Sequence, residues 1–209
     1  MGFFTKDIKL MSDLFMHGLQ DLYYAENQIA KWLPDMIEKA TNRELKAGFE
    51  KHLSETEGQI HRLRQIFEML DAEAEGDKCP AIDGILKEGK DLAGEIDDKD
   101  VMNVGLVASA QAVEHYEITR YGALIAWATE LGHNNCVPLL KASLAEEKAT
   151  DQKLTALAER RVNPEGEKKT AGVKKAPKRA ASTARRKRKS QARATKAKRS
   201  GAKKVRKRA

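Results

Sequence analysis

Four long segments carry apolar residues at the three- and four-residue spacing of an α-helix, and this pattern constrains the fold more than any other feature of the chain. The segments cover about residues 7–40, 41–70, 100–131 and 135–161. A shorter, Gly-interrupted helix is predicted for residues 82–96. No segment shows the two-residue alternation that is typical of a β-strand. The sequence therefore predicts an all-α fold.

The links between these segments predict how the helices are connected. Short links join the first segment to the second and the third to the fourth, whereas residues 71–99 separate the second from the third. This is the connectivity of a four-helix bundle with one long crossover that contains a short helix, as in ferritin-like folds. The folded domain is predicted to cover residues 1–163.

Local signals predict where individual helices start and stop. Thr41 followed by Glu44 predicts a capping box at the start of the second helix. Pro34 predicts a kink or an early end in the first helix. The pair Asn163 and Pro164 predicts the end of the fourth helix.

The end of the chain has a charge opposite to that of the rest. Residues 168–209 contain 20 Lys and Arg and no Asp or Glu, whereas residues 1–167 carry 19 basic and 31 acidic side chains and hence a net charge of −12. Most other residues near the C-terminus are Ala, Ser, Thr or Gly, which offer too little apolar surface to offset chain entropy. A disordered basic tail is therefore predicted for residues 164–209.

The composition of this tail favours binding to nucleic acid, since each Lys or Arg that meets a phosphate releases condensed counterions. It resembles the tails of linker histones and of bacterial histone-like proteins. Residues 168–209 are predicted to bind duplex DNA or other nucleic acid, with little sequence preference because the tail has no aromatic side chain for base stacking. A solubilising segment, a membrane-surface segment and a segment that binds the acidic body are alternatives.

The features of the sequence that bear on location in the cell predict the cytoplasm. No apolar run approaches the 18 residues of a membrane-spanning helix, and Lys6, Asp7 and Lys9 interrupt any secretory signal. Cys79 and Cys136 have no metal-ligand spacing, so free thiols in a reducing compartment are expected. The sequence predicts a cytoplasmic, nucleoid-associated protein that does not enter a membrane.

Acidic side chains occupy positions where the helical period calls for apolar ones. They are Glu26, Glu114, Glu117, Glu147 and Asp151. An unpaired buried carboxylate costs several kcal/mol, so such groups must be paired, protonated or bound to a metal. In di-iron and di-manganese bundles, inward carboxylates and histidines from the four helices hold the ions. A buried network satisfied by Tyr hydroxyls and by Lys or Arg is the alternative.

Three sequence stretches carry a family resemblance. YYAEN around Glu26, TRYGALIAWATELG after EHYE, and LAEEKATDQKL around Glu147 together resemble the bacterial YciE/YciF family of ferritin-like stress proteins. The resemblance covers about residues 3–162. It implies a homodimer, a role in bacterial stress response, and a di-iron or di-manganese centre with peroxide or oxygen chemistry.

The resemblance also implies a ligand set, from which this chain departs in part. Glu26 matches the Glu of the first helix, Glu114 and Glu117 match the Glu-x-x-Glu of the third, and Glu147 matches the Glu of the fourth. The departures are Thr150 in place of a His, and Thr56 and Gln59 in place of a Glu and a His. Two residues near the seam could substitute as metal ligands, Asp151 and His52.

Three functions are compatible with these patterns. The first is a ferritin-like stress-response protein that binds a di-metal centre and associates non-specifically with DNA through its tail. The second is a non-enzymatic, architectural nucleoid-binding protein whose helical body only dimerises. The third is a di-metal oxidase with a specific organic substrate. The metal content of the purified protein distinguishes the second from the others.

Overall fold

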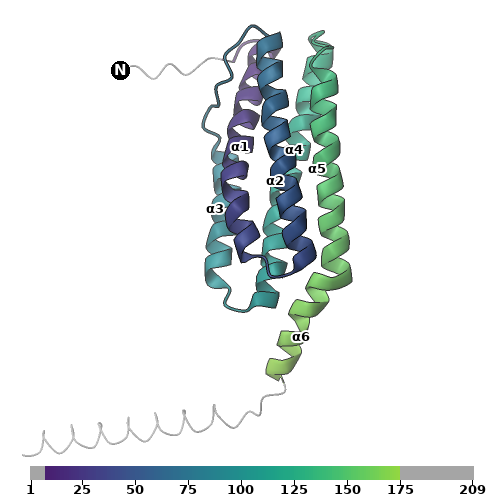
Figure 1. Ribbon diagram of the computed structural model, residues 1–209. Coiled ribbons are helices and arrows are strands. Elements are labelled where there is room, and N and C mark those ends of the chain that lie inside the picture. The colour runs from purple at the N-terminus through teal and green to yellow at the C-terminus, as the bar shows by residue number, and fades with distance from the viewer. Residues whose placement is uncertain (1–7, 175–209) are drawn as a thin grey trace, which may run out of the picture. The chain divides into compact units, whose positions relative to one another are not determined.

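The computed structural model describes residues 8–174, and these residues form helices and no strands. Figure 1 shows their order along the chain. The elements are α1 (Met11–Lys39), α2 (Arg43–Met69), α3 (Pro80–Glu95), α4 (Lys99–Glu130), α5 (Val137–Leu157), the π-helical turn η1 (Ala158–Val162) and α6 (Asn163–Lys174).

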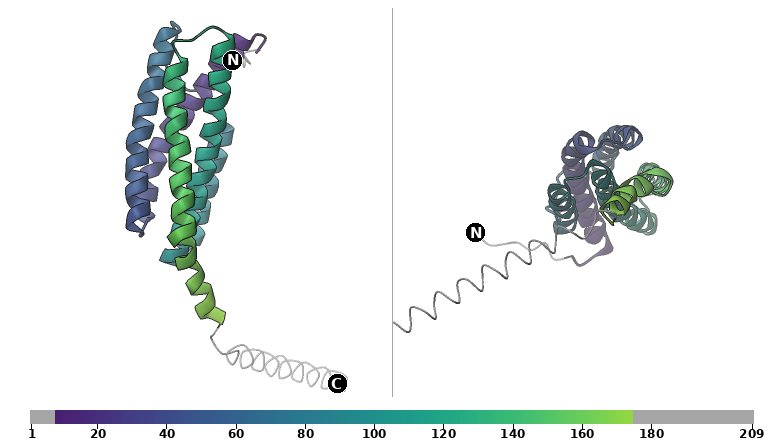
Figure 2. Two further views of the ribbon diagram at one scale, coloured as in Figure 1. Left: turned by 90° about the vertical axis from the view of Figure 1, so that its right-hand side faces the viewer. Right: turned by 90° about the horizontal axis from the view of Figure 1, so that it is seen from below.

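Four of these helices form the bundle, and α3 belongs to the crossover. Helix α1 packs against α2 and α4, and α5 packs against α4 and α2, so each bundle helix has two bundle neighbours. Helix α3 lies outside this square against α1 and α4 (Figures 1 and 2). The all-α, ferritin-like bundle with one long crossover and a short crossover helix is confirmed.

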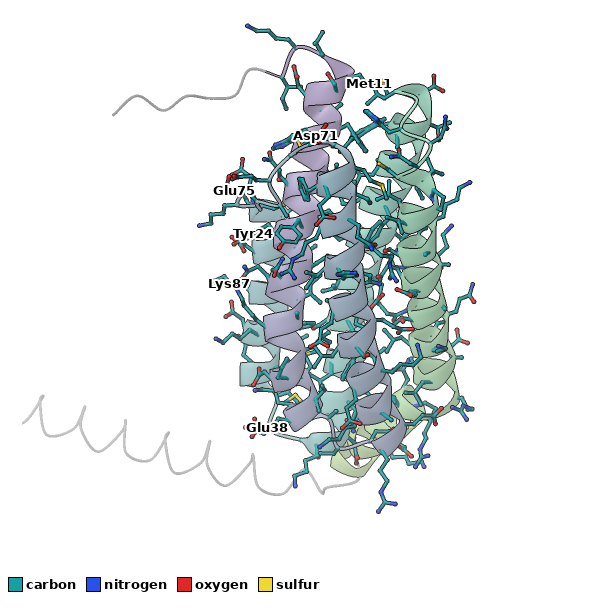
Figure 3. The ribbon with its side chains drawn as sticks, turned by 45° about the horizontal axis from the view of Figure 1, so that its top comes forward. Met11, Tyr24, Glu38, Asp71, Glu75 and Lys87 are labelled. Atoms are coloured by element: carbon teal, nitrogen blue, oxygen red, sulfur yellow. The ribbon has the colours of Figure 1, made fainter. Side chains whose placement is uncertain are left out.

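The crossover is held against α1 by a hydrogen bond and by a close backbone approach. Tyr24 Oη donates to Asp83 Oδ1 of α3 over 2.9 Å. Figure 3 shows Tyr24 on the face of α1 beside the segment that carries Glu75. A Cβ at Gly76 would lie 3.0 Å from the Tyr24 Cβ, a tighter contact than side chains usually make, so a glycine suits this approach.

The start of α2 differs by one residue from the prediction. The side chain of Asn42, rather than Thr41, accepts hydrogen bonds from the backbone N–H groups of Glu44 and Leu45. Thr41 instead contacts α4, since Asn103 Nδ2 donates to its hydroxyl over 2.9 Å. The cap of α2 and its anchor to α4 are thus two neighbouring side chains with separate roles.

The predicted early end of the first helix at Pro34 and the predicted end of the fourth at Asn163 and Pro164 are wrong, whereas the alternative of a kink at Pro34 stays a prediction. Helix α1 passes through Pro34 and ends at Lys39. The helix that follows α5 continues past Pro164, as α6, to Lys174. The π-helical turn η1 comes immediately before α6 and breaks the regular i→i−4 ladder at the point where a proline would otherwise clash with it. The sequence can therefore remain helical through Asn163 and Pro164.

The chain divides into two units, Met1–Lys168 and Lys169–Ala209, and the bundle lies in the first. The predicted tail begins at residue 164, within α6, and from residue 175 it lies outside the described residues. Of the helices in residues 8–174, none combines the length and apolarity needed to cross a bilayer.

The core of the bundle is two apolar clusters with a polar layer between them. One cluster contains Ile29, Leu33, Phe49 and Leu154, and the other contains Leu19, Leu22, Leu63, Phe67 and Leu140. Along each bundle helix the change from one cluster to the other falls at a buried polar residue. These residues are Glu26 on α1, Thr56 and Gln59 on α2, Glu114 and Glu117 on α4, and Glu147 on α5.

Candidate metal centre

The polar layer brings ligand groups from three helices close together. One donor atom each from His52, Glu114, Glu117 and Glu147 lies within 4.8 Å of the others. His52 Nε2 is 3.2 Å from Glu114 Oε1. None of the four side chains is more than 3% exposed. They lie side by side because each occupies an inward position of its helix at the same level of the bundle.

Burial and mutual repulsion set the charge of this layer when no cation is bound. Desolvation, reinforced by the charge of Glu147, raises the pKa of Glu114 to about 11. Desolvation raises the pKa of Glu147 to about 7, although contacts with Glu114 and Gln59 oppose it. The pKa of the Glu117 carboxyl is raised well above its ordinary value by burial and by Glu26 and Glu147. The layer therefore retains protons at neutral pH in the absence of a cation.

The contact between His52 and Glu114 is close enough for an ion pair, but burial opposes the charged forms of both groups. Desolvation lowers the pKa of His52 to about 4, with Lys51 as a smaller cause. A neutral imidazole therefore faces a carboxylic acid. A neutral imidazole is also the form of histidine that binds metals.

Most of the oxygen atoms in the layer lack a hydrogen-bond partner within the protein. Both carboxylate oxygens of Glu117 are buried without a donor, as is one oxygen each of Glu26, Glu114 and Glu147. An unsatisfied buried polar group costs about 1–3 kcal/mol. So many acceptors facing one another need protons or a cation between them, and hydrogen bonds within the protein do not supply either.

The spacing of the donor atoms suits a metal ion. Oxygen and nitrogen ligands lie about 2.0–2.2 Å from an ion such as zinc, so donors on opposite sides of one ion are about 4 Å apart. The donor atoms of the cluster lie within 4.8 Å of one another, so small side-chain rotations would bring them to this separation. Carboxylate oxygens and one imidazole nitrogen form a donor set for hard or borderline cations. The residues present fit a metal centre.

Glu26 completes the layer from α1 and is held by Tyr121. Tyr121 Oη donates to Glu26 Oε1 over 2.5 Å, and both side chains are fully buried. Burial and the charge of Glu26 raise the pKa of Tyr121 well above its ordinary value, so the phenol keeps the proton that it donates. Desolvation and Glu147 likewise raise the pKa of Glu26.

The structure places the remaining candidate ligands differently. Asp151 is partly buried outside the cluster, where it accepts a hydrogen bond of 3.0 Å from Gln111 Nε2 and lies 3.4 Å from His115 Nε2. His52 lies inside the cluster, one turn before Thr56. Of the six predicted ligands, four form the cluster, Glu26 lies in the same layer, and Asp151 does not join them.

Neutral side chains fill the positions where the sequence departs from the family pattern. Thr56 and Gln59 are fully buried on α2, and Thr150 is buried on α5. Gln59 Nε2 donates to Glu147 Oε1 and, over 3.1 Å, to Glu146 Oε2. Glu146 is not among the ligands predicted from the sequence. Its position next to Glu147 was the available signal.

A four-helix bundle with a crossover and an inward layer of carboxylates and histidine defines the ferritin-like class of proteins. Residues 10–166 match the family described as a domain of unknown function, DUF892, and the chain belongs to this family. It is 40% identical to protein YciF of Escherichia coli strain K12 over 164 residues, which are 78% of this chain and 99% of that protein. The predicted relationship to the YciE/YciF family is confirmed.

Solved structures share the fold. YcfI of Rhodopseudomonas palustris, provisionally called a structural protein, is 57% identical, with a TM-score of 0.72 over 73% of this chain and 98% of that one. The E. coli stress protein YciF is 40% identical, with a TM-score of 0.71 over 75% and 99%. A Xanthomonas campestris protein, XCC3681, is 22% identical with a TM-score of 0.63 over 77% and 99%, and shows the fold alone.

Proposed function

We propose that this protein is a ferritin-like stress protein whose buried layer binds iron or manganese. The observation that carries the proposal is the group of four nearly inaccessible ligand side chains, His52, Glu114, Glu117 and Glu147, with donor atoms within 4.8 Å of one another. The similarity to the E. coli stress protein YciF supports the role in stress response. Buried carboxylates in apolar register are costly to the fold, and a metal centre gives a reason for their presence.

The charge of the layer favours two divalent cations. Glu26, Glu114, Glu117 and Glu147 carry four negative charges when all are ionised, and His52 is neutral. Two divalent cations balance these charges, whereas one leaves two carboxylates that must stay protonated. Because the carboxyl pKa values are raised without metal, loading must release protons.

When bound, iron or manganese supplies one-electron chemistry towards peroxide or oxygen. The chain's own residues hold and orient the ligands. Tyr121 fixes Glu26 and Gln59 fixes Glu147, so two carboxylates keep their orientation by hydrogen bonds that do not involve a cation. The two apolar clusters on either side of the layer keep bulk water away from it.

Calorimetric titration of the metal-free full-length chain with Mn²⁺, and with Fe²⁺ under anaerobic conditions, tests the proposal. The native chain is expected to bind up to two ions. The double variant Glu114→Gln and Glu147→Gln is expected to bind none, because it removes two ionisable ligands without changing side-chain volume. Glu57→Gln with Glu130→Gln, on exposed helix surfaces, is the matched control.

Full binding by the Glu114 and Glu147 double variant would show that the site is wrong. A native chain that takes up no metal would overturn the proposal and favour the architectural alternative, in which the bundle only dimerises. Circular dichroism on every variant ensures that lost binding reflects lost ligands, since the helical signal is expected to be unchanged.

We also propose that residues 168–209 bind duplex DNA without sequence preference. The 20 Lys and Arg of this segment support the proposal, as does the net charge of −12 on residues 1–167, which by itself repels phosphates. Bound to DNA, the metal centre would take up iron or peroxide where hydroxyl radicals cause damage. This gives a reason for the two parts to occur in one chain.

A chain that ends at Lys168 tests the DNA proposal. The cut falls after Gly166, which lies against Val104 and Asp100 of α4, so the bundle stays complete. The shortened chain is expected to lose most DNA affinity. For the full chain, contact by half of the 20 charges gives a slope of about −9 for log affinity against log salt. Equal affinity of the two chains in low salt would contradict the proposal.

A further inference from the structure

The proposed centre has no direct contact with solvent, so a cation needs a route into it. His52, Glu114, Glu117 and Glu147 are at most 3% exposed. The two apolar clusters close the bundle along its axis on both sides of the layer. An approach along the bundle axis would have to displace packed leucine and phenylalanine side chains. The sides of the bundle, between neighbouring helices, are therefore the places to search.

A chain of hydrogen bonds crosses the seam between α2 and α5. Buried Gln59 donates from Nε2 to Glu147 Oε1 of the centre and also to Glu146 Oε2. The side chain of Glu146 is 29% exposed and pairs with Arg62, which is 20% exposed. Glu146 and Glu147 are consecutive residues of α5, so one points into the layer and the other towards solvent. Gln59 thus connects a carboxylate of the centre to a carboxylate that solvent reaches.

Arg62 covers the outer end of this chain of contacts. Its Nη2 donates to Glu146 Oε2, and its Nε donates to Ser143 Oγ over 3.0 Å. Its charge is also felt inside the layer, where it lowers the pKa values of Glu26 and Glu147 against the effect of burial. A guanidinium in this position repels an approaching cation until it turns away from Glu146.

Neutral oxygen atoms of α2 are buried in the polar layer, at the inner end of this chain of contacts. Gln59 Oε1 and Thr56 Oγ1 are fully buried and have no hydrogen-bond partner. Amide and hydroxyl oxygens bind hard divalent cations but, being uncharged, hold them less strongly than carboxylates do. Such donors suit a place that a cation passes through, since a further buried carboxylate would retain it.

We propose that Glu146, Arg62 and Gln59 form the entrance through which a divalent cation reaches the buried layer. Glu146 attracts the cation from solvent, and Arg62 swings outward as it arrives. The Gln59 amide, whose Nε2 donates to both carboxylates in the metal-free chain, then turns so that its oxygen passes the cation to Glu147. This inference rests on the proposed metal binding. It predicts that the three residues determine how fast the centre takes up metal. They are positioning residues for uptake and are not ligands of the loaded centre.

The rate of Co²⁺ uptake tests the entrance, with loading followed in a stopped-flow instrument by the visible absorption of the protein-bound ion. Glu146→Gln on the full-length chain is expected to load about tenfold more slowly, the lower end of the roughly 10- to 1000-fold range by which charge focused at a cleft raises on-rates. Arg62→Gln is expected to load faster. Both variants should bind the native number of ions. Glu57→Gln, an exposed glutamate on α2, is the matched control and should load at the native rate.

The opposite directions of the two effects separate an entrance from general damage. If both variants load faster, the substitutions have loosened the bundle and the entrance is wrong. It is equally wrong if Glu146→Gln loads at the native rate and with the native salt dependence. A native chain that binds no Co²⁺ would show that the proposed centre itself is wrong. Variants that bind the native number of ions at unchanged rates would show that only the entrance is wrong.

Discussion

Replacing Glu114 by Gln should stabilise the metal-free protein and at the same time abolish its stabilisation by metal. Glu114 is a buried carboxyl whose pKa is raised to about 11 in the folded chain, so it stays protonated there at neutral pH. In the unfolded chain the same group ionises at its ordinary value of 4.5. The unfolded state therefore gains stability as the pH rises through this interval, and the folded metal-free state becomes relatively less stable. Gln has the same shape and no proton to lose.

The magnitude follows from the pH interval. Each pH unit between the two pKa values contributes about 1.36 kcal/mol, so the change from about pH 5 to about pH 8 gives a ceiling of about 4 kcal/mol. The observed effect should be smaller because part of the shift of Glu114 comes from the charge of Glu147, a carboxyl whose own pKa burial raises to about 7. An increase of about 2–4 kcal/mol in the free energy of unfolding is expected near pH 8, and little change near pH 5.

Urea denaturation of chelator-treated protein at the two pH values, followed by circular dichroism, measures this effect. A repeat with excess Mn²⁺ should stabilise the native chain and leave Glu114→Gln unchanged. Glu57→Gln serves as the control, since its exposed side chain should show neither effect. Equal destabilisation of Glu114→Gln at both pH values would refute the reasoning, because it would mean that the carboxyl contributes packing or hydrogen bonding alone.

Three further predictions concern other parts of the structure. Tyr121→Phe removes the hydrogen bond to Glu26 and should weaken Mn²⁺ binding about 10- to 100-fold in calorimetry without changing the helical signal; native affinity would contradict its orienting role. Asn42→Ala removes the cap of α2 and should cost about 1 kcal/mol in denaturation, whereas no loss would mean that the cap contributes nothing. The chain should form a homodimer, because Leu10, Met11 and Met69 are exposed apolar side chains near the start of α1 and the end of α2; light scattering that gives the mass of one 23.3 kDa chain would rule it out.

The bundle could be predicted from the sequence because its helices pack through a repeating pattern of apolar residues. Helices pack through inward stripes of apolar residues, and those stripes are visible as three- and four-residue spacing. The stripes also mark the polar layer, since Glu26, Glu114 and Glu147 interrupt them at inward positions. Where the chain departs from the family's ligand pattern, His52 and Asp151 were the predicted substitutes because both lie near the seam. Packing separates them, with His52 facing Glu114 and Asp151 turned towards Gln111.

Other features depend on contacts that no local pattern contains. Asn42 caps α2, whereas the Thr41 hydroxyl accepts a hydrogen bond from Asn103, a residue of α4 that is distant in sequence. The chain remains helical through Pro164 because a π-helical turn, which lies against α4, absorbs the irregularity. In the sequence, Gln59 stands where the family pattern has a metal ligand. Its hydrogen bond to Glu146 requires α2 and α5 to be side by side.

The polar layer also determines how the four helices align along their axes. Two apolar clusters of similar composition would tolerate a helix that slides by one turn, about 5.4 Å, because leucine would still meet leucine or phenylalanine. With the layer present, such a slide of α5 would move Glu147 away from His52 and Gln59 and into an apolar cluster. An unpartnered carboxylate there costs several kcal/mol, whether or not it is protonated. The residues that make the metal-free bundle less stable are thus the ones that give it a single alignment, as a polar residue does in the seam of a coiled coil.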